Sequence, residues 1–114
     1  MARRKTPKKI KIGYSEFKII PRSNEWGKRN KAFGDCIPES AQIQYDASQK
    51  RAEIVNTIIH ETLHGIVYMF DINFKNVKEE EKVVRKIANG LHTVFKDNPH
   101  FLEWIMQNAD KADE

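Results

Sequence analysis

The sequence predicts an α+β fold, in which a small twisted antiparallel or mixed sheet packs on a buried helix and a second long helix. Two observations support this class. In the first half of the 114-residue chain apolar residues alternate with polar ones, whereas in the second half they recur at helical spacing. Strands therefore come first and helices later, an order typical of α+β domains. We place a single domain at residues 9–110, after a basic flexible arm at residues 1–8.

The strands are expected before the midpoint of the chain. Alternating apolar residues at positions 9–20 predict a strand pair with a turn between its members. Pro21 is expected to end this pair, and residues 22–31, rich in Arg, Asn, Lys and Gly, to form a polar connection. Two further short strands are predicted at residues 32–37 and 41–45.

The helices are expected in the second half. Apolar residues recur at helical spacing from Ile54 to Phe70, in a stripe wide enough to predict a helix deep in the core. We expect a loop at residues 71–78 and then a second long helix at residues 79–96, whose early glutamates suit the positive end of the helix dipole. Pro99 is expected to begin a third, short helix.

The composition predicts a cytoplasmic protein with no membrane partner. No stretch approaches the roughly 18 to 20 apolar residues that a membrane-spanning helix needs. The N-terminus also lacks the apolar segment that follows the charges of a signal peptide. Cys36 is the only cysteine, so no internal disulfide can form, and this favours a reducing compartment.

The whole chain has a net charge of +4, and positive charge is concentrated at its start. Such an arm can bind nucleic acid through phosphate contacts, which stays open as the less favoured interpretation. A solubilising tail is favoured, because no aromatic residues are interleaved with the charges. The basic residues concerned are Arg3, Arg4, Lys5, Lys8, Lys9 and Lys11.

The first long helix contains the segment His60-Glu61-Thr62-Leu63-His64, which matches the H-E-x-x-H pattern of zinc peptidases. Residues four apart lie above one another on a helix, so the two imidazoles can bind one metal ion. Glu61 would then be the general base for a water at that metal. The alternative is two ordinary histidines and a surface glutamate. It is less favoured, because these groups are costly to bury in an apolar helix without strong partners.

A catalytic zinc site needs a third protein ligand and one open position. The extended metzincin pattern is excluded, because apolar residues stand where it requires Gly and His. Glu80 and Glu81 are the main candidates, and periodicity does not decide between them. At least two of the three glutamates at positions 79–81 are expected to be solvated. His92 and His100 are weaker candidates, since a lone histidine is more often a surface or packing residue.

Several segments between residues 9 and 99 together carry a resemblance to a known family. Besides the strand-like residues 9–20 and the strand ending at Tyr45, these are Phe33-Gly34-Asp35, the segment from Thr57 to Ile66 around the zinc motif, Glu80-Glu81-Lys82-Val83-Val84, Ala88-Asn89-Gly90-Leu91 and Lys96-Asp97-Asn98-Pro99. In these segments the chain resembles the minimal zinc metallopeptidases encoded by phages and prophages. It is more distantly similar to the ImmA/IrrE and SprT-like peptidases.

The resemblance implies a zincin-like, more specifically gluzincin-like, fold and a Zn²⁺ cofactor. Matched by position, the third ligand beside His60 and His64 falls on Glu81, with Glu80 as the reserve. The chain departs from the family at Gly65, where an aliphatic residue or Ala is common, and in its basic arm. Both departures leave the substrate open, and the fold itself implies none.

The leading hypothesis is therefore hydrolysis of a peptide or protein substrate, with Glu61 as the catalytic base. One alternative is a phage regulatory or nucleic-acid-binding protein that retains the metal site without peptidase activity. Another is a structural zinc domain with a closed site of four ligands. For oxyanion stabilisation, Tyr45, Tyr68 and His92 remain equal candidates. The sheet edge near residues 33–37 is expected to align substrate by strand addition.

Overall fold

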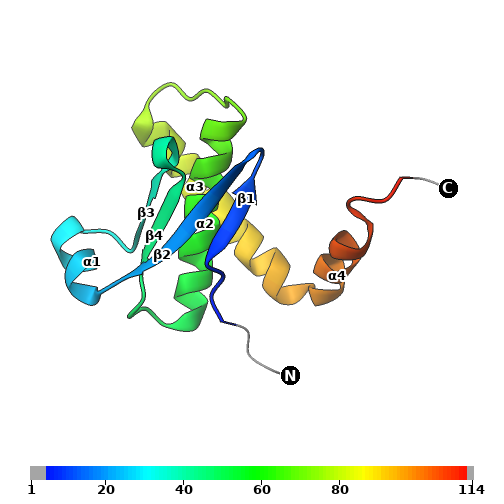
Figure 1. The fold of residues 1–114 in the computed structure, drawn as a ribbon, viewed down its shortest axis with the longest axis horizontal. Helices are drawn as coiled ribbons and strands as arrows, with labels where there is room; N and C mark the ends of the chain where they lie inside the picture. Colours follow the sequence, from blue (N-terminus) through cyan, green and yellow to red (C-terminus); the bar gives the residue numbers. More distant parts are fainter. Residues whose placement is uncertain (1–4, 113–114) are drawn as a thin grey trace.

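The computed structural model describes residues 5–112, so Arg3 and Arg4 of the expected basic arm lie outside the described residues. All four strands precede the midpoint of the chain and helices fill its second half, as the sequence predicts, but an unexpected helix, α1, lies among the strands (Figure 1). The elements are β1 (Lys9–Ile12), β2 (Ser15–Arg22), α1 (Asn24–Asn30), β3 (Gly34–Ile37), a 3-10 turn η1 (Pro38–Ser40), β4 (Gln42–Asp46), α2 (Arg51–Met69), α3 (Val77–Asp97) and α4 (Pro99–Asn108).

The four strands form one mixed sheet in the order β1-β2-β4-β3. The pairs β1–β2 and β3–β4 are antiparallel, whereas β2 and β4 run parallel. The parallel pair arises because the chain passes through α1 and the edge strand β3 before it returns as β4. The sequence leaves antiparallel and mixed sheets open, and the structure has the mixed one.

The core lies between the sheet and α2. Phe17 and Ile43 are fully buried, and Ile12, Ile19 and Tyr45 complete the buried cluster from the same side of the sheet. The α2 residues packed against this cluster are Ile54, Ile58, Ile66 and Met69. Gly65 brings α2 close to β1, since a Cβ atom there would stand 2.7 Å from the Ile12 Cδ1. The wide apolar stripe thus marks a central helix, as expected.

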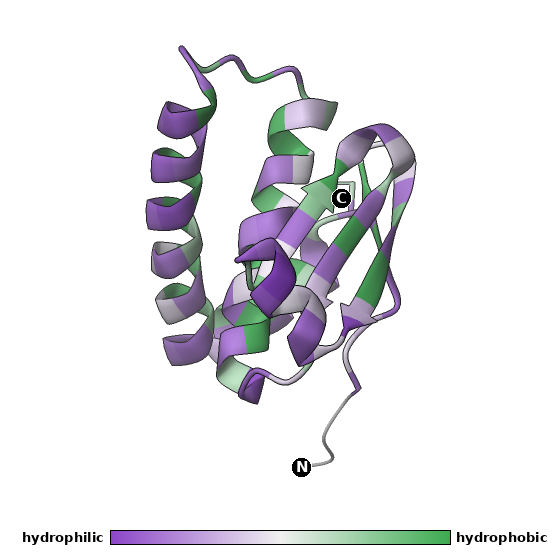
Figure 2. Ribbon diagram, turned by 90° about the vertical axis from the view of Figure 1, so that its left-hand side faces the viewer, coloured by the Kyte–Doolittle hydropathy of each residue, from purple (hydrophilic) through white to green (hydrophobic). Residues whose placement is uncertain are grey.

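A third layer is formed by α3, which packs on the side of α2 opposite the sheet (Figure 2). Val84 and Ala88 are buried along this contact, and the small Ala88 side chain allows the helices to approach closely. The helix begins at Val77, earlier than predicted, because the side chain of Asn76 accepts a hydrogen bond from the backbone N–H of Glu79 at 2.8 Å.

Two sequence predictions about residues 21–31 were wrong. The expected polar connection contains α1, whose first turn is capped by Ser23, since the Ser23 hydroxyl accepts from the Trp26 N–H at 3.2 Å. Pro21 does not end β2. The N–H of Ile19, two residues before Pro21 in the strand, points to the β1 side and donates to the Lys8 carbonyl. The nitrogen of Pro21, which carries no hydrogen, therefore faces the same side. At this position β1 no longer pairs with β2, so no hydrogen bond is lost.

Among residues 5–112, the structure contains no helix that is both long and apolar enough to cross a membrane.

Candidate metal centre

His60 and His64 project from one face of α2 toward α3. Because they are four residues apart on a helix, their rings lie one turn from each other, with ring centroids 5.0 Å apart. The two Nε2 atoms are 3.2 Å apart. The predicted convergence of the two imidazoles is therefore present in the fold.

Glu81 completes a group with these histidines from the facing helix. Its Oε1 lies 2.7 Å from the His60 Nε2, and its Oε2 lies 2.9 Å from the His64 Nε2. One ligand atom from each of the three residues falls within 4.8 Å of the others. The packing of Val84 and Ala88 against α2 sets the rotation of α3 that brings Glu81 to this position.

The dimensions of this group suit a small metal ion. Four ligands at zinc distances of about 2.0 to 2.1 Å in a tetrahedron stand about 3.3 Å from one another. The three contacts here measure 2.7, 2.9 and 3.2 Å. Two histidines and one glutamate are also a donor set that catalytic zinc sites use, with the fourth position left open. The residues present therefore fit the ion that the sequence motif implies.

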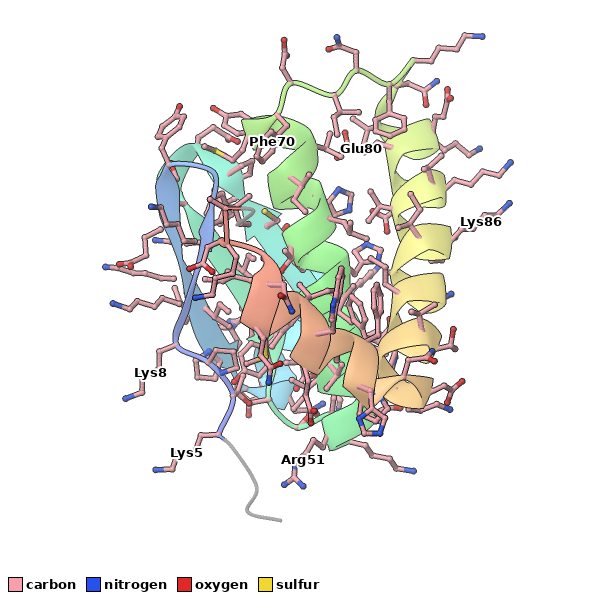
Figure 3. The ribbon with its side chains drawn as sticks, turned by 90° about the vertical axis from the view of Figure 1, so that its right-hand side faces the viewer. Lys5, Lys8, Arg51, Phe70, Glu80 and Lys86 are labelled. Carbon is pink, nitrogen blue, oxygen red and sulfur yellow. The ribbon has the colours of Figure 1, made fainter. Side chains whose placement is uncertain are left out.

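Glu80 contacts the other side of the His64 ring. Its Oε2 lies 2.7 Å from the His64 Nδ1, while the Nε2 of the same ring faces His60 and Glu81. Figure 3 shows Glu80 on the side of α3 that faces α2, with Lys86 projecting away from the helix pair. The expectation that two of the three glutamates are solvated was wrong, since only Glu79 is exposed. Sequence periodicity missed this because both Glu80 and Glu81 lie near the boundary of the buried face of α3.

The two histidines differ in their electrostatic surroundings. Burial lowers the pKa of His60, and the nearby Glu81 carboxylate opposes this effect only in part. For His64 burial acts in the same direction, but hydrogen bonds to Glu80 and Glu81 and the charge of Glu61 outweigh it, so the pKa of His64 is raised. The carboxylates that surround His64 therefore create the more negative half of the group.

Glu61 lies beside this group in the wall between α2 and β3. Its side chain is buried, with a residue exposure of 7%. Burial raises its pKa from 4.5 to about 7, an effect that the nearby His64 opposes and the charges of Asp35 and Glu81 reinforce. Gly34 makes room for it, because a Cβ atom at Gly34 would stand 3.1 Å from the Glu61 Oε2. The position therefore holds a carboxyl group that can exchange a proton near neutral pH.

A cleft of about 1240 Å³ opens over these residues. The edge strand β3 forms one wall through Gly34, Asp35 and Cys36, and the α2–α3 pair forms the other. The residues of the predicted site that line this cleft are His60, Glu61, His64, Glu80 and Glu81. An extended peptide thus has access to an unpaired strand edge within the same cleft.

Other sequence candidates are placed elsewhere. His92 accepts a hydrogen bond at its Nδ1 from the side-chain amide of Asn56 at 3.2 Å and lines a smaller neighbouring cavity. His100 is almost fully exposed on α4. Tyr45 is buried in the core, whereas Tyr68 lines the metal cleft, so Tyr68 is the oxyanion candidate that the cleft retains.

Two further residues of the cleft carry chemistry that the sequence did not single out. Arg85 lies one turn after Glu81 on α3, with its Nη2 4.0 Å from the Glu81 Oε1. Cys36 lines the β3 wall, where burial and then the charge of Glu61 raise the pKa of its thiol to about 12. The signal for Arg85 was its spacing of four from Glu81, which becomes informative only once Glu81 is assigned.

Comparison of the chain with protein-family models, with curated proteins and with solved structures finds no match.

Proposed function

We propose that this protein is a zinc-dependent metallopeptidase, a minimal zincin-like enzyme of the kind that phages and prophages encode. One observation carries the proposal. Three ligand atoms from His60, His64 and Glu81 converge within 4.8 Å, and the buried carboxyl of Glu61 adjoins them in an open cleft. No fourth ligand joins this group among the described residues, which favours a catalytic over a closed structural site.

The chemistry divides between the ion and the protein. A zinc ion held by this group would make a water molecule more acidic and polarise the carbonyl of the substrate. Glu61 takes a proton from the attacking water and delivers it to the leaving amine. Burial favours the protonated form of the Glu61 carboxyl over the charged form, which makes this group a stronger proton acceptor than an exposed glutamate.

Substrate alignment follows from the sheet topology. As the edge strand, β3 pairs with β4 on one side only, so its other side presents free backbone groups. An extended peptide that adds to this side runs along the cleft wall formed by Gly34 and Asp35, beside Glu61. Backbone hydrogen bonds to β3 would then hold the scissile bond over the histidines.

The test combines metal content with hydrolysis. After reconstitution with zinc, the wild-type protein and a Glu61→Gln variant should each retain about one ion, whereas a His60→Ala variant should lose it. Wild-type protein should hydrolyse peptides from a diverse mixture, and Glu61→Gln should lower the rate by about 10² to 10⁴. Equal zinc in the wild type and His60→Ala would remove the proposed site. Zinc-loaded wild type that cleaves no peptide would overturn the peptidase assignment.

A further inference from the structure

On the α2 and α3 faces that line the metal cleft, the side chains one turn from the ligand group differ in polarity between the two ends of the helix pair. On α2, residues at successive spacings of four line the cleft, and the same holds on α3, so each set occupies one helix face. The α2 set is Asn56, His60, His64 and Tyr68, and the α3 set is Val77, Glu81 and Arg85. The histidines and Glu81 thus have neighbours on both sides along the same faces.

The helices α2 and α3 run in opposite directions on either side of a short connection, so a residue late in α2 lies at the same end of the pair as a residue early in α3. Tyr68 and Val77 both lie one turn from the ligand group toward that connection, and Asn56 and Arg85 lie one turn the other way. Four residues of helix correspond to about 6 Å. Two aliphatic or aromatic side chains therefore flank the metal group at one end, and an amide and a guanidinium flank it at the other.

Ile72 adds to the apolar end. It lies in the connection between the helices, where its backbone N–H donates to the Val67 carbonyl at 2.9 Å, and its side chain lines the cleft. We name Tyr68, Ile72 and Val77 the apolar rim. Their exposed fractions are 52%, 46% and 83%, so the rim offers apolar surface to solvent at the mouth of the site.

Exposed apolar residues occur elsewhere on this protein and need no explanation singly. Phe70 and Met106, for example, are also exposed. The rim differs because its three members, from α2, the connection and α3, gather at one end of the cleft that holds the ligand group, whereas Phe33 lines this cleft from the segment before β3. Apolar surface that gathers at a concave site is typical of a binding region.

We propose that the apolar rim is a specificity subsite, which binds a bulky apolar side chain of the peptide substrate within two residues of the scissile bond. The inference rests on the proposed function and adds the substrate class. The position follows from geometry: side chains on the same face of an extended peptide repeat about every 6.6 Å, close to the 6 Å between the ligand group and the rim. Substrates with apolar residues near the cleavage point are thereby selected over uniformly polar ones.

The first experiment compares cleavage of paired peptides by the zinc-loaded protein. The peptides are identical except that each position within two residues of the cleaved bond carries Leu or Ser. At one such position, kcat/KM should favour Leu by about tenfold or more, because the apolar surface of a Leu side chain is removed from water when it packs on the rim. The preference should shrink in Val77→Asn and Ile72→Asn and persist in Tyr68→Phe, which keeps the ring. Equal rates for Leu and Ser at every position would overturn the inference while leaving the peptidase proposal intact.

A matched control and a binding measurement separate this inference from its premise. Phe70→Ser removes an equally exposed apolar side chain, which lies near the β1–β2 turn and outside the cleft lining, so it should keep the preference. Binding of the same Leu and Ser peptides to zinc-loaded Glu61→Gln is then measured by calorimetry. Tighter binding of the Leu peptide, weakened by Val77→Asn but not by Phe70→Ser, supports the rim even if cleavage is slow. Identical binding of both peptides contradicts it.

Discussion

The Oε2 of Glu80 lies 2.7 Å from the Nδ1 of His64, on the opposite side of the ring from the nitrogen that faces Glu81. A carboxylate in this place favours the tautomer with the proton on Nδ1, which leaves Nε2 free to bind a metal. The adjacent Glu80 and Glu81 thus contact one histidine at its two nitrogens. In the proposed site Glu81 would be a metal ligand, and Glu80 would orient the ring of the ligand His64.

The first prediction concerns this orienting contact. Glu80→Ala should weaken zinc binding by about 10- to 100-fold, the usual cost of losing such a partner. Glu80→Gln should weaken it less, because its amide oxygen still accepts from Nδ1–H. Zinc affinity is measured by competition with a chromogenic chelator, and the His64 tautomer by ¹⁵N NMR of the metal-free protein. Glu79→Ala is the control from the same helical turn. An unchanged tautomer and affinity in Glu80→Ala would show that the contact has no orienting role.

A second prediction concerns the close approach of β3 to α2. A Cβ atom at Gly34 would stand 2.5 Å from the Thr57 Cγ2 and 3.1 Å from the Glu61 Oε2. Gly34→Ala should therefore destabilise the fold by about 1 to 3 kcal/mol, the usual cost of overpacking. Gly90→Ala is the matched control, because a Cβ atom there meets nothing within 4 Å, and on an exposed helix it should stabilise by about 0.5 to 1 kcal/mol. Both values come from urea unfolding, and equal midpoints for the two variants would contradict the packing argument.

A third prediction concerns the acid stability of the turn before α2. The Ser48 hydroxyl and N–H donate to Asp46 at 2.6 and 2.9 Å; together with Asn24, and against burial, they hold the pKa of Asp46 below its ordinary value of 3.8. A carboxyl whose pKa is lowered by folding stabilises the fold above its unfolded pKa, and this contribution is lost as the pH falls through the folded pKa.

The difference in urea midpoint between the wild type and Asp46→Asn should therefore be largest near neutral pH and shrink below about pH 3.8. Asp110→Asn, at an exposed position beyond α4, serves as the control and should leave the midpoint unchanged at each pH. A difference that stays constant down to pH 2 would show that the Asp46 hydrogen bonds do not depend on its charge.

A fourth prediction uses Cys36 as a reporter of the β3 wall. Because burial and the charge of Glu61 raise its thiol pKa to about 12, little thiolate forms near pH 8 in the metal-free protein. Alkylation by iodoacetamide should therefore be at least about a hundredfold slower in the folded than in the urea-unfolded chain. Mass spectrometry at timed intervals measures both rates. Similar rates would mean that β3 does not shield the thiol.

The parts of the site that depend on local spacing could be predicted from the sequence. His60, Glu61 and His64 share one helix, and the i, i+4 relation alone brings the two rings together. The roles of Glu80 and Glu81 depend on the rotation of α3 about its axis, which is set by the tertiary contacts of Val84 and Ala88. The residues alone therefore supplied both candidates but no choice between them.

The fold, like the site, has features set by local sequence patterns and others set by nonlocal contacts. Helical periodicity predicted α2, because its apolar face is long and continuous. The polar helix α1 lacks such a face and depends instead on the Ser23 cap and on Gly27, which packs against the Asp46 carboxylate. The order of the strands in the sheet could not be predicted from the sequence either, since the parallel pairing of β2 with β4 joins segments that are distant in sequence. Local patterns therefore predicted elements, and nonlocal contacts decided their assembly.

All three proposed ligands come from the helical hairpin of α2 and α3, and the sheet supplies none of them. The segment between the helices is short, so bringing the ligands together costs little chain entropy. An ion in this position would bind both helices of the hairpin at once. It would therefore stabilise any partly folded state in which the two helices are already docked. The sheet would then serve the proposed site in two other ways, by packing its buried face against α2 and by keeping the β3 edge open beside Glu61.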